Sequence, residues 1–170
     1  MKKNPQNKRF SKADREPTDE SLDPYLNEQP DFEPARCSVC GNIYRNKQWY
    51  HPEIVNDVVK EMKMKTATCP GCKKVQDRYY YGEVKASGDF MFEHREEISH
   101  LIENEIQRAQ KKNPLEKLVA AKAAEGEVLF RTTNGKLAER LGRALEKAYQ
   151  GELKQEKSGN VTRVWWKRES

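Results

Sequence analysis

The stretches Cys37-Ser38-Val39-Cys40-Gly41 and Cys69-Pro70-Gly71-Cys72 decide the fold of this 170-residue chain, and they hold all four of its cysteines. A two-residue gap lets two thiolates at one tight turn bind the same ion, and a second such turn completes a tetrahedral site. Gly41 and Pro70-Gly71 supply the turn chemistry. The pattern predicts one structural Zn²⁺ with no position open for water or substrate. Its ligands are Cys37, Cys40, Cys69 and Cys72.

Two other uses of the cysteines fit the sequence less well. A redox dithiol needs only one of the two pairs. Disulfides form in oxidising compartments, and the start of the chain, Met1-Lys2-Lys3-Asn4-Pro5, is not followed by the apolar run of a secretory signal. No stretch approaches the roughly 20 apolar residues of a membrane span. We expect a soluble, cytoplasmic protein without a membrane partner.

The composition favours small modules and an acidic partner. Charged residues make up 35% of the chain, hydrophobic residues another 35%, and the mean hydropathy is −1.07. This is little apolar material for one large core, and a bound metal ion would help a small module to fold. The net charge of +5 and the pI of about 8.9 favour an acidic partner such as nucleic acid.

Residues 1–34 are predicted to be a disordered tail. The part from 1 to 15 is basic, the part from 16 to 33 is acidic, and four prolines interrupt the second part and its end. We favour a solvated tail. The alternative is a basic arm that becomes ordered on RNA, with the acidic block limiting non-specific binding.

Residues 35–88 are predicted to form the Cys₄ zinc-ribbon or zinc-knuckle module. An apolar stripe of Ile54, Val58 and Met62 indicates an amphipathic helix over residues 52–63. Short strands are predicted at residues 43–44, 48–50, 79–81 and 84–86.

The rest of the chain is predicted to be a charged linking helix, 89–113, followed by a ββαββ module, 114–170. A strand at 128–133, a helix at 135–149 and a final hairpin at 152–168 are clear. Residues 116–123 are ambiguous, because their composition favours helix while a tight turn at Glu125-Gly126 would make them a strand. The fold class is therefore α+β.

No catalytic site is apparent in the sequence. The three histidines, His51, His94 and His100, do not share a helix face, and no metalloprotease, serine-hydrolase or dinucleotide motif occurs. We expect neither an enzyme nor a small-molecule substrate.

Aromatic and basic residues occur together at several places, as in proteins that stack bases and hold phosphates. Because neighbouring residues on a strand point to opposite faces, one of Trp165 and Trp166 should enter the core and the other should face solvent or a partner. The alternative is that both are buried. The candidate nucleic-acid contacts are Lys73, Lys74, Arg78, Tyr80, Arg140, Arg143, Lys147, Arg163, Trp165, Trp166, Lys167 and Arg168.

Several features follow one another in a fixed order over residues 35–168. They are Cys37-x-x-Cys40-Gly41 followed by Trp49, then Cys69-Pro70-x-Cys72, a tyrosine-rich strand from Tyr80 to Gly88, a charged helix, a strand-helix-strand unit with Ala138 and Leu141, and a basic last strand. This order resembles the amino-terminal region of the nonsense-mediated decay protein three family, the adaptors for export of the large ribosomal subunit. It is also similar to small bacterial zinc-knuckle proteins of unknown function.

The resemblance implies zinc at the four cysteines and docking on the large ribosomal subunit. It also favours strand for residues 116–123, against helix propensity, and we follow it. Larger members carry further cysteine pairs, β-rich domains and export signals, so nuclear export is not carried over. We expect a non-enzymatic, zinc-stabilised adaptor that binds rRNA or the ribosome, in assembly, quality control or dormancy. The alternative is a zinc-scaffolded protein-interaction module.

Overall fold

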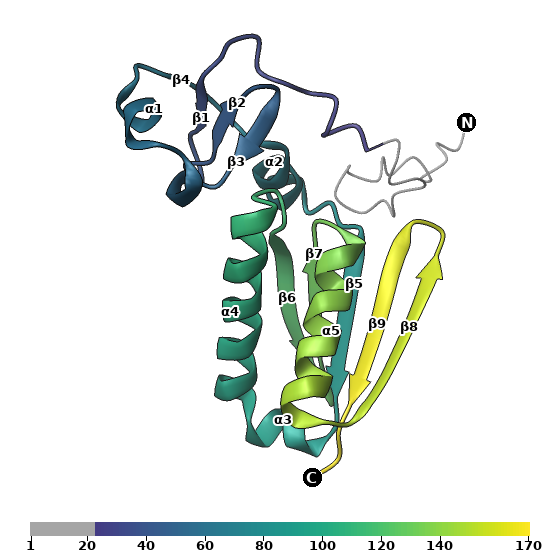
Figure 1. Ribbon diagram of the computed structural model, residues 1–170. Helices are drawn as coiled ribbons and strands as arrows, with labels where there is room; N and C mark the ends of the chain where they lie inside the picture. The colour runs from purple at the N-terminus through teal and green to yellow at the C-terminus, as the bar shows by residue number, and fades with distance from the viewer. Residues whose placement is uncertain (1–22) are drawn as a thin grey trace, which may run out of the picture.

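The computed structural model describes residues 23–170, which form an α+β fold with two sheets (Figure 1). The smaller sheet has the strand order β3-β2-β1-β4, with β1 and β4 parallel. The predicted hairpin of residues 43–50 is present as β2 and β3. The strands are β1 (Ala35–Cys37), β2 (Ile43–Arg45), β3 (Gln48–Tyr50) and β4 (Lys65–Ala67).

The larger sheet has five strands in the order β6-β7-β5-β9-β8. Its central strand β5 pairs antiparallel with β7 and parallel with β9. The predicted boundary of the Cys₄ module at residue 88 is therefore wrong, because it placed β5 in that module. We call residues 35–77 the metal module, and the five-stranded sheet with its helices the sheet module. The strands are β5 (Gly82–Ser87), β6 (Leu118–Ala124), β7 (Glu127–Thr132), β8 (Glu152–Ser158) and β9 (Val161–Lys167).

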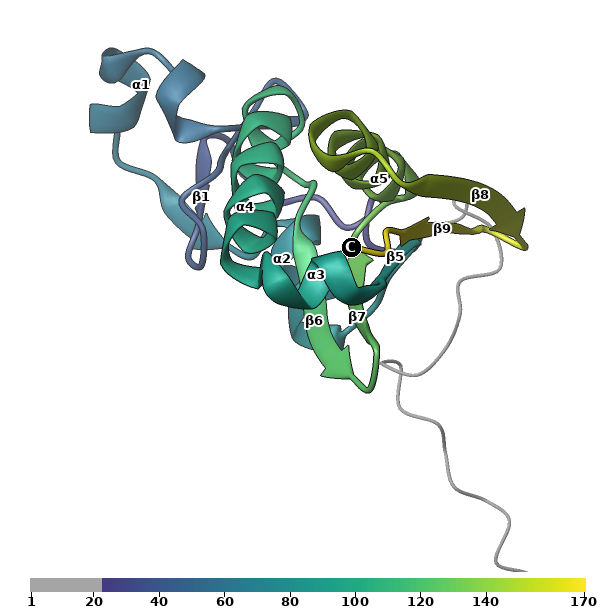
Figure 2. The ribbon, with the colours of Figure 1, turned by 90° about the horizontal axis from the view of Figure 1, so that it is seen from below.

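Three helices, α3 (Asp89–Glu93), α4 (Arg95–Lys112) and α5 (Gly135–Tyr149), belong to this sheet module. Figure 2 shows α4 and α5 on the same side of the strands. The α5 boundaries match the predicted helix, and the Asn134 side chain caps it by accepting from the Leu137 N–H at 2.9 Å.

The predicted linking helix is a part of the core. It breaks at His94 into α3 and α4, and α4 buries Ile98, Ile102 and Ile106 beneath it. The narrow apolar stripe of this charged segment thus packs onto the sheet module. Among residues 23–170, no helix combines the length and apolar composition needed to cross a bilayer.

Strand residues of the larger sheet alternate between a buried face and a helix-free face. In β5, Val84 and Ala86 are fully buried while Lys85 between them is part-exposed. In β9, Trp166 is fully buried and Trp165 is part-exposed. Within residues 23–170, Figure 2 shows no helix lying along the second face, although α2 (Pro70–Asp77) contacts β6 near the metal module.

Residues 118–124 form a strand. The family resemblance implied a strand here, whereas the helix propensity of the residues favoured a helix. The turn depends on Gly126, whose φ of +76° is disfavoured for residues with a side chain. Pairing with β7 satisfies the backbone of this alanine-rich segment, so tertiary contacts override its local preference.

The helix predicted over residues 52–63 is broken into a 3-10 turn, Pro52–Ile54, and a short α1, Asp57–Glu61. Asn56 is extended, and its side chain caps α1 by accepting from the Val58 N–H at 2.8 Å. This local bond competes with a continuous helix. The apolar stripe consequently lies in solvent, with Val58 69% exposed.

Residues 23–34 of the predicted disordered tail pack on the rest of the fold, and the basic part of the tail, 1–15, lies outside the described residues. Asp23 and Tyr25 are buried. The Tyr44 hydroxyl donates to Gln29 Oε1 at 2.8 Å, and Glu33 accepts two backbone N–H groups of the β2–β3 turn at 3.0 Å. The acidic segment is thus bound to the rest of the fold, because its polar side chains find fixed partners.

Candidate metal centre

The four cysteines predicted as metal ligands lie together. Their Sγ atoms are all within 4.8 Å of one another, and no other cluster of His, Cys, Asp or Glu with this geometry occurs among residues 23–170. Cys37, Cys69 and Cys72 are buried, and Cys40 is part-exposed. All four are free thiols, so the predicted pairing into one cluster is confirmed and disulfides are absent.

Two local turns place the thiols. Cys37 ends β1, and Gly41 turns the chain with a φ of +79°. Cys69 caps α2, its Sγ accepting from the Cys72 N–H at 3.4 Å. The Cys69 N–H in turn donates to Cys37 Sγ at 3.3 Å, which joins the two turns.

The spacing of the sulfur atoms fits one tetrahedral ion. Metal–sulfur bonds of about 2.3 Å place the sulfur atoms of a tetrahedron about 3.8 Å apart. Cys40 Sγ and Cys69 Sγ are 3.7 Å apart. Four thiolates are the donors of structural zinc and iron sites and leave no ligand position for a substrate.

Mutual contacts shift the thiol pKa values in opposite directions. Hydrogen bonding with Cys40 lowers the pKa of Cys37. Cys37 in turn raises the pKa of Cys40, but Cys69 and Cys72 outweigh it and lower that pKa to about 6. Contact with Cys37 raises the pKa of both Cys69 and Cys72. The four groups cannot all ionise in contact without a cation, which a bound metal ion supplies.

Helix α2 was missed by the sequence analysis. Pro70 stands at its first turn, after Cys69 as a sulfur cap, and a proline in this position was the available signal. The helix ends at Arg78, which is left-handed with a φ of +53°. Tyr79–Tyr81, predicted as strand, precede β5, although the Tyr81 N–H donates to Thr132 O at 3.1 Å and extends the pairing.

The metal cluster is in direct contact with the sheet module. The buried Asn42 side chain donates to Pro114 O at 2.9 Å and lies 3.9 Å from Cys69 Sγ. Leu115 packs against the cysteine cluster. Gly71 approaches the Leu115 backbone so closely that a Cβ there would lie 2.7 Å from the carbonyl oxygen. Residues 113–117 therefore form a joint between the two modules.

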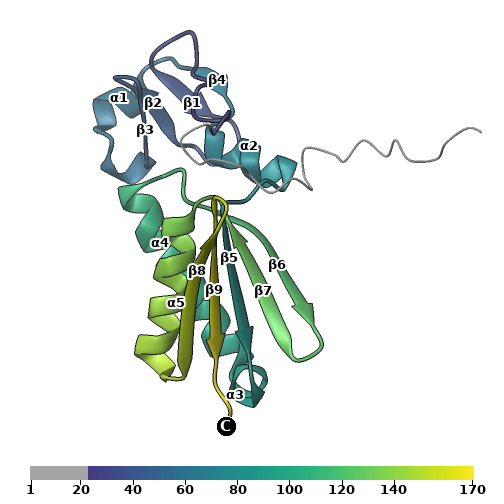
Figure 3. The same cartoon turned by 90° about the vertical axis from the view of Figure 1, so that its right-hand side faces the viewer.

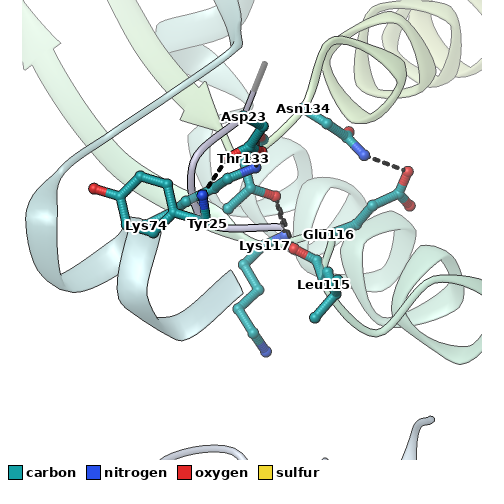
Figure 4. Close-up of polar contacts among 8 residues, drawn as sticks. All are labelled: Asp23, Tyr25, Lys74, Leu115, Glu116, Lys117, Thr133 and Asn134. Carbon is teal, nitrogen blue, oxygen red and sulfur yellow. Dashed lines mark hydrogen bonds and ion pairs between the residues drawn. The ribbon is translucent and has the colours of Figure 1, made fainter. Parts of the chain in front are cut away.

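The far side of this joint is held by the β7–α5 turn (Figure 4). The Thr133 hydroxyl donates to Leu115 O at 2.9 Å and accepts from the Lys117 N–H at 2.9 Å. The Asn134 side chain donates to Glu116 Oε1 at 3.0 Å.

Two of the predicted nucleic-acid contacts, Lys73 and Lys74, face the acidic segment instead. Lys74 is buried, forms an ion pair with the buried Asp23, donates to Thr133 O at 3.3 Å and lies over the Tyr81 ring. Lys73 pairs with Glu28 at 2.6 Å. The described structure therefore gives Lys74 a role in packing at the joint.

The basic residues of α5 lie on the outer side of the helix layer. Arg140 pairs with Glu105 of α4 at 2.9 Å, and Arg143 lies 3.6 Å from Glu139. Lys147 is exposed.

The basic residues of β9 lie on the opposite side of the molecule from those of α5. Arg163, Trp165 and Lys167 are on the helix-free face, whereas the fully buried Trp166 donates from Nε1 to Gln150 O at 2.7 Å. The α5 and β9 groups therefore do not form one continuous surface.

The remaining candidates differ in exposure. Arg78 is exposed at the end of α2. Tyr80 is buried with the Arg131 guanidinium 4.3 Å from its ring centre. Arg168 lies over the Phe90 ring and donates to Tyr149 O.

Three lysines of the helix-free face were not among the predicted contacts: Lys85, Lys122 and Lys154. Lys85 and Lys154 are the direct strand neighbours of Trp165, and Lys122 lies opposite Leu129. Only the strand order and register bring them together, so no local sequence signal could have identified them.

Comparisons with family models, with curated proteins and with solved structures found no match for this chain, so its function is argued from its own residues.

Proposed function

We propose that the protein is a zinc-stabilised, non-enzymatic adaptor that binds RNA, and that it binds this RNA as part of the ribosome. Zn²⁺ is the ion of choice because a closed set of four thiolates is typical of structural zinc sites. The ion would stabilise the metal module and take no part in a reaction.

The observation that carries RNA binding is the helix-free face of the five-stranded sheet. Cations outnumber carboxylates on this face, and a tryptophan lies among them. The cations are Lys85, Lys122, Arg131, Lys154, Arg163 and Lys167, and the carboxylates are Glu83, Glu127, Glu152 and Glu156. A sheet face with cations and an aromatic ring is a common platform for RNA.

The test is sedimentation of the tagged protein from its native lysate through a gradient at low and high salt. Co-migration with the large ribosomal subunit at low salt, lost as salt rises, is the expected result, since phosphate contacts weaken with ionic strength. Migration at the top of the gradient at low salt would contradict ribosome binding.

A second candidate function, a protein-interaction module, is favoured by the exposed apolar stripe of the metal module. Ile54, Val58 and Met62 are 58%, 69% and 47% exposed. Such a stripe fits an apolar partner surface. If co-sedimentation with the ribosome resists salt and Val58→Asp abolishes it, the protein-interaction function is favoured over RNA binding. If co-sedimentation is lost at high salt and Val58→Asp leaves it intact at low salt, the apolar stripe does not bind the ribosome.

A further inference from the structure

One row of side chains crosses the helix-free face from edge to edge. The register places Lys122 opposite Leu129, Leu129 opposite Lys85, Lys85 beside Trp165, and Trp165 opposite Lys154. We call these five residues the Trp165 row. At the usual strand spacing it is roughly 19 Å long. Figure 3 shows the five strands that contribute to it, from β6 to β8.

Trp165 is the only tryptophan of the chain that is not buried. Trp49 is 9% exposed and Trp166 is fully buried, whereas Trp165 is part-exposed on the helix-free face. Trp165 lines a shallow hollow of about 460 Å³ together with Ser87, Glu152, Lys154, Glu156 and Lys167. A large ring kept at the surface of a charged face is suited to contact with a flat ligand.

The charge of the Trp165 row is purely positive, since it holds three lysines and no carboxylate. Of the carboxylates on the same face, Glu152 and Glu156 lie on β8 on either side of Lys154, whereas Glu83 and Glu127 are partly neutralised within the sheet. Glu83 lies 3.2 Å from Arg131 and 3.8 Å from Arg163, and Glu127 lies 3.4 Å from Lys85.

The two ends of the row are available to an anion. Within residues 23–170, neither Lys122 nor Lys154 forms an ion pair with another residue. Lys122 also lines a second hollow of about 500 Å³ with Arg78 and Arg131. Cations thus flank the exposed ring on both sides, and a ligand that complements this row needs a flat ring between anionic groups.

We propose that the Trp165 row binds single-stranded RNA, with one base stacked on Trp165 and phosphates held by Lys154, Lys85 and Lys122. This rests on the proposed RNA-binding function and adds the site and the form of RNA. In a duplex each base face is covered by its neighbours, whereas an unpaired base can stack on a protein ring. The strand would run across the β-strands, along the row.

The test measures binding of the full chain, with zinc, to a fluorescein-labelled oligouridylate of about ten nucleotides, by anisotropy at several salt concentrations. Trp165→Ala should weaken binding about 5- to 150-fold, and Trp165→Phe should retain part of it. Lys154→Ala and Lys122→Ala should each lower the slope of log affinity against log salt by about 0.7.

Two controls separate a local role from a general one. Lys136→Ala removes an exposed cation of α5, on the helix-covered side of the sheet, and should leave the affinity unchanged. The intrinsic tryptophan fluorescence should be quenched by the oligonucleotide in the wild-type protein and unaffected in Trp165→Phe, because the other two tryptophans are buried. An RNA duplex of the same length should compete weakly.

The outcomes distinguish this site from the proposed function. If the wild-type protein binds RNA or ribosomes and Trp165→Ala binds equally well, the site is wrong while RNA binding stands. The site would also be wrong if the Lys122 and Lys154 variants bound RNA with unchanged affinity but no longer bound a protein partner. If the wild-type protein binds neither oligonucleotide nor ribosome at low salt, the proposed function fails and this site fails with it.

Discussion

The two modules bury very different kinds of core. The sheet module encloses a contiguous set of apolar side chains, including the fully buried Leu137, Leu141 and Trp166. The cluster of buried residues around the cysteines of the metal module is much smaller, and Cys37, Cys69 and Cys72 are three of its six members. Apolar burial stabilises the sheet module, whereas the metal module would depend on the proposed ligation of Zn²⁺, so the two should respond to different perturbations.

The largest expected effect is loss of the metal through Cys69→Ser. Binding of a structural Zn²⁺ contributes about 10–16 kcal/mol to small modules, so this variant should lose the ion and unfold residues 35–77 while the sheet module stays folded. Metal content by mass spectrometry and hydrogen exchange resolved by peptide would report both effects. Ser38→Ala, an exposed neighbour of a ligand, should change neither. A metal-free Cys69→Ser protein with full protection of the module would refute its dependence on the ion.

Asp23→Ala should have the next largest effect, because it leaves the buried Lys74 without its carboxylate. Removing one partner of a buried ion pair costs about 3–5 kcal/mol. Chemical denaturation would measure the loss, and Asp31→Ala, exposed on the same segment, serves as the control. Equal stability of the two variants would show that the segment from residue 23 does not support the joint.

Leu141→Ala should destabilise the sheet module by about 2–5 kcal/mol, since Leu141 is fully buried beneath the helix layer. The metal content should stay at that of the wild type. Calorimetry with metal analysis of the same sample tests both points, and Lys147→Ala is the matched change on the exposed side of α5. Loss of metal in Leu141→Ala would show that metal binding depends on the core of the sheet module, so the two modules would not respond separately to the two kinds of change.

Asn42→Ala should cost about 1–3 kcal/mol, because it leaves the buried Pro114 carbonyl without its donor. Its more specific effect is to weaken the joint, so that one thermal transition separates into two. Asn56→Ala, which removes an exposed cap of α1, should lower stability without separating the transitions. Coincident unfolding of both modules in Asn42→Ala would show that other contacts suffice to couple them.

Local patterns predicted much of this fold. The cysteine spacing identified the cluster, and the helix at 135–149 and the final hairpin at 152–168 lie where local patterns predicted them. Each of these depends on residues that are close in sequence, or on a side-chain chemistry with few alternatives.

Most of the remaining errors concern long-range contacts, and one concerns the local bond at Asn56. No local signal shows that residues 82–87 pair with β7 and β9, or that α4 packs on the sheet module. The apolar stripe at Ile54, Val58 and Met62 predicted a helix that Asn56 interrupts. From the sequence alone Lys74 is expected to be solvent-exposed, because its partner Asp23 is distant in the chain.

The central position of β5 has a consequence for synthesis on the ribosome. Gly82 pairs with Thr162 at one end of the parallel β5–β9 ladder, and β5 cannot acquire this neighbour until β9 has been made. At about 5–20 residues per second, that delay is roughly 4–16 s. The four cysteines all precede β5, so every ligand of the proposed ion is translated before the central strand of the larger sheet.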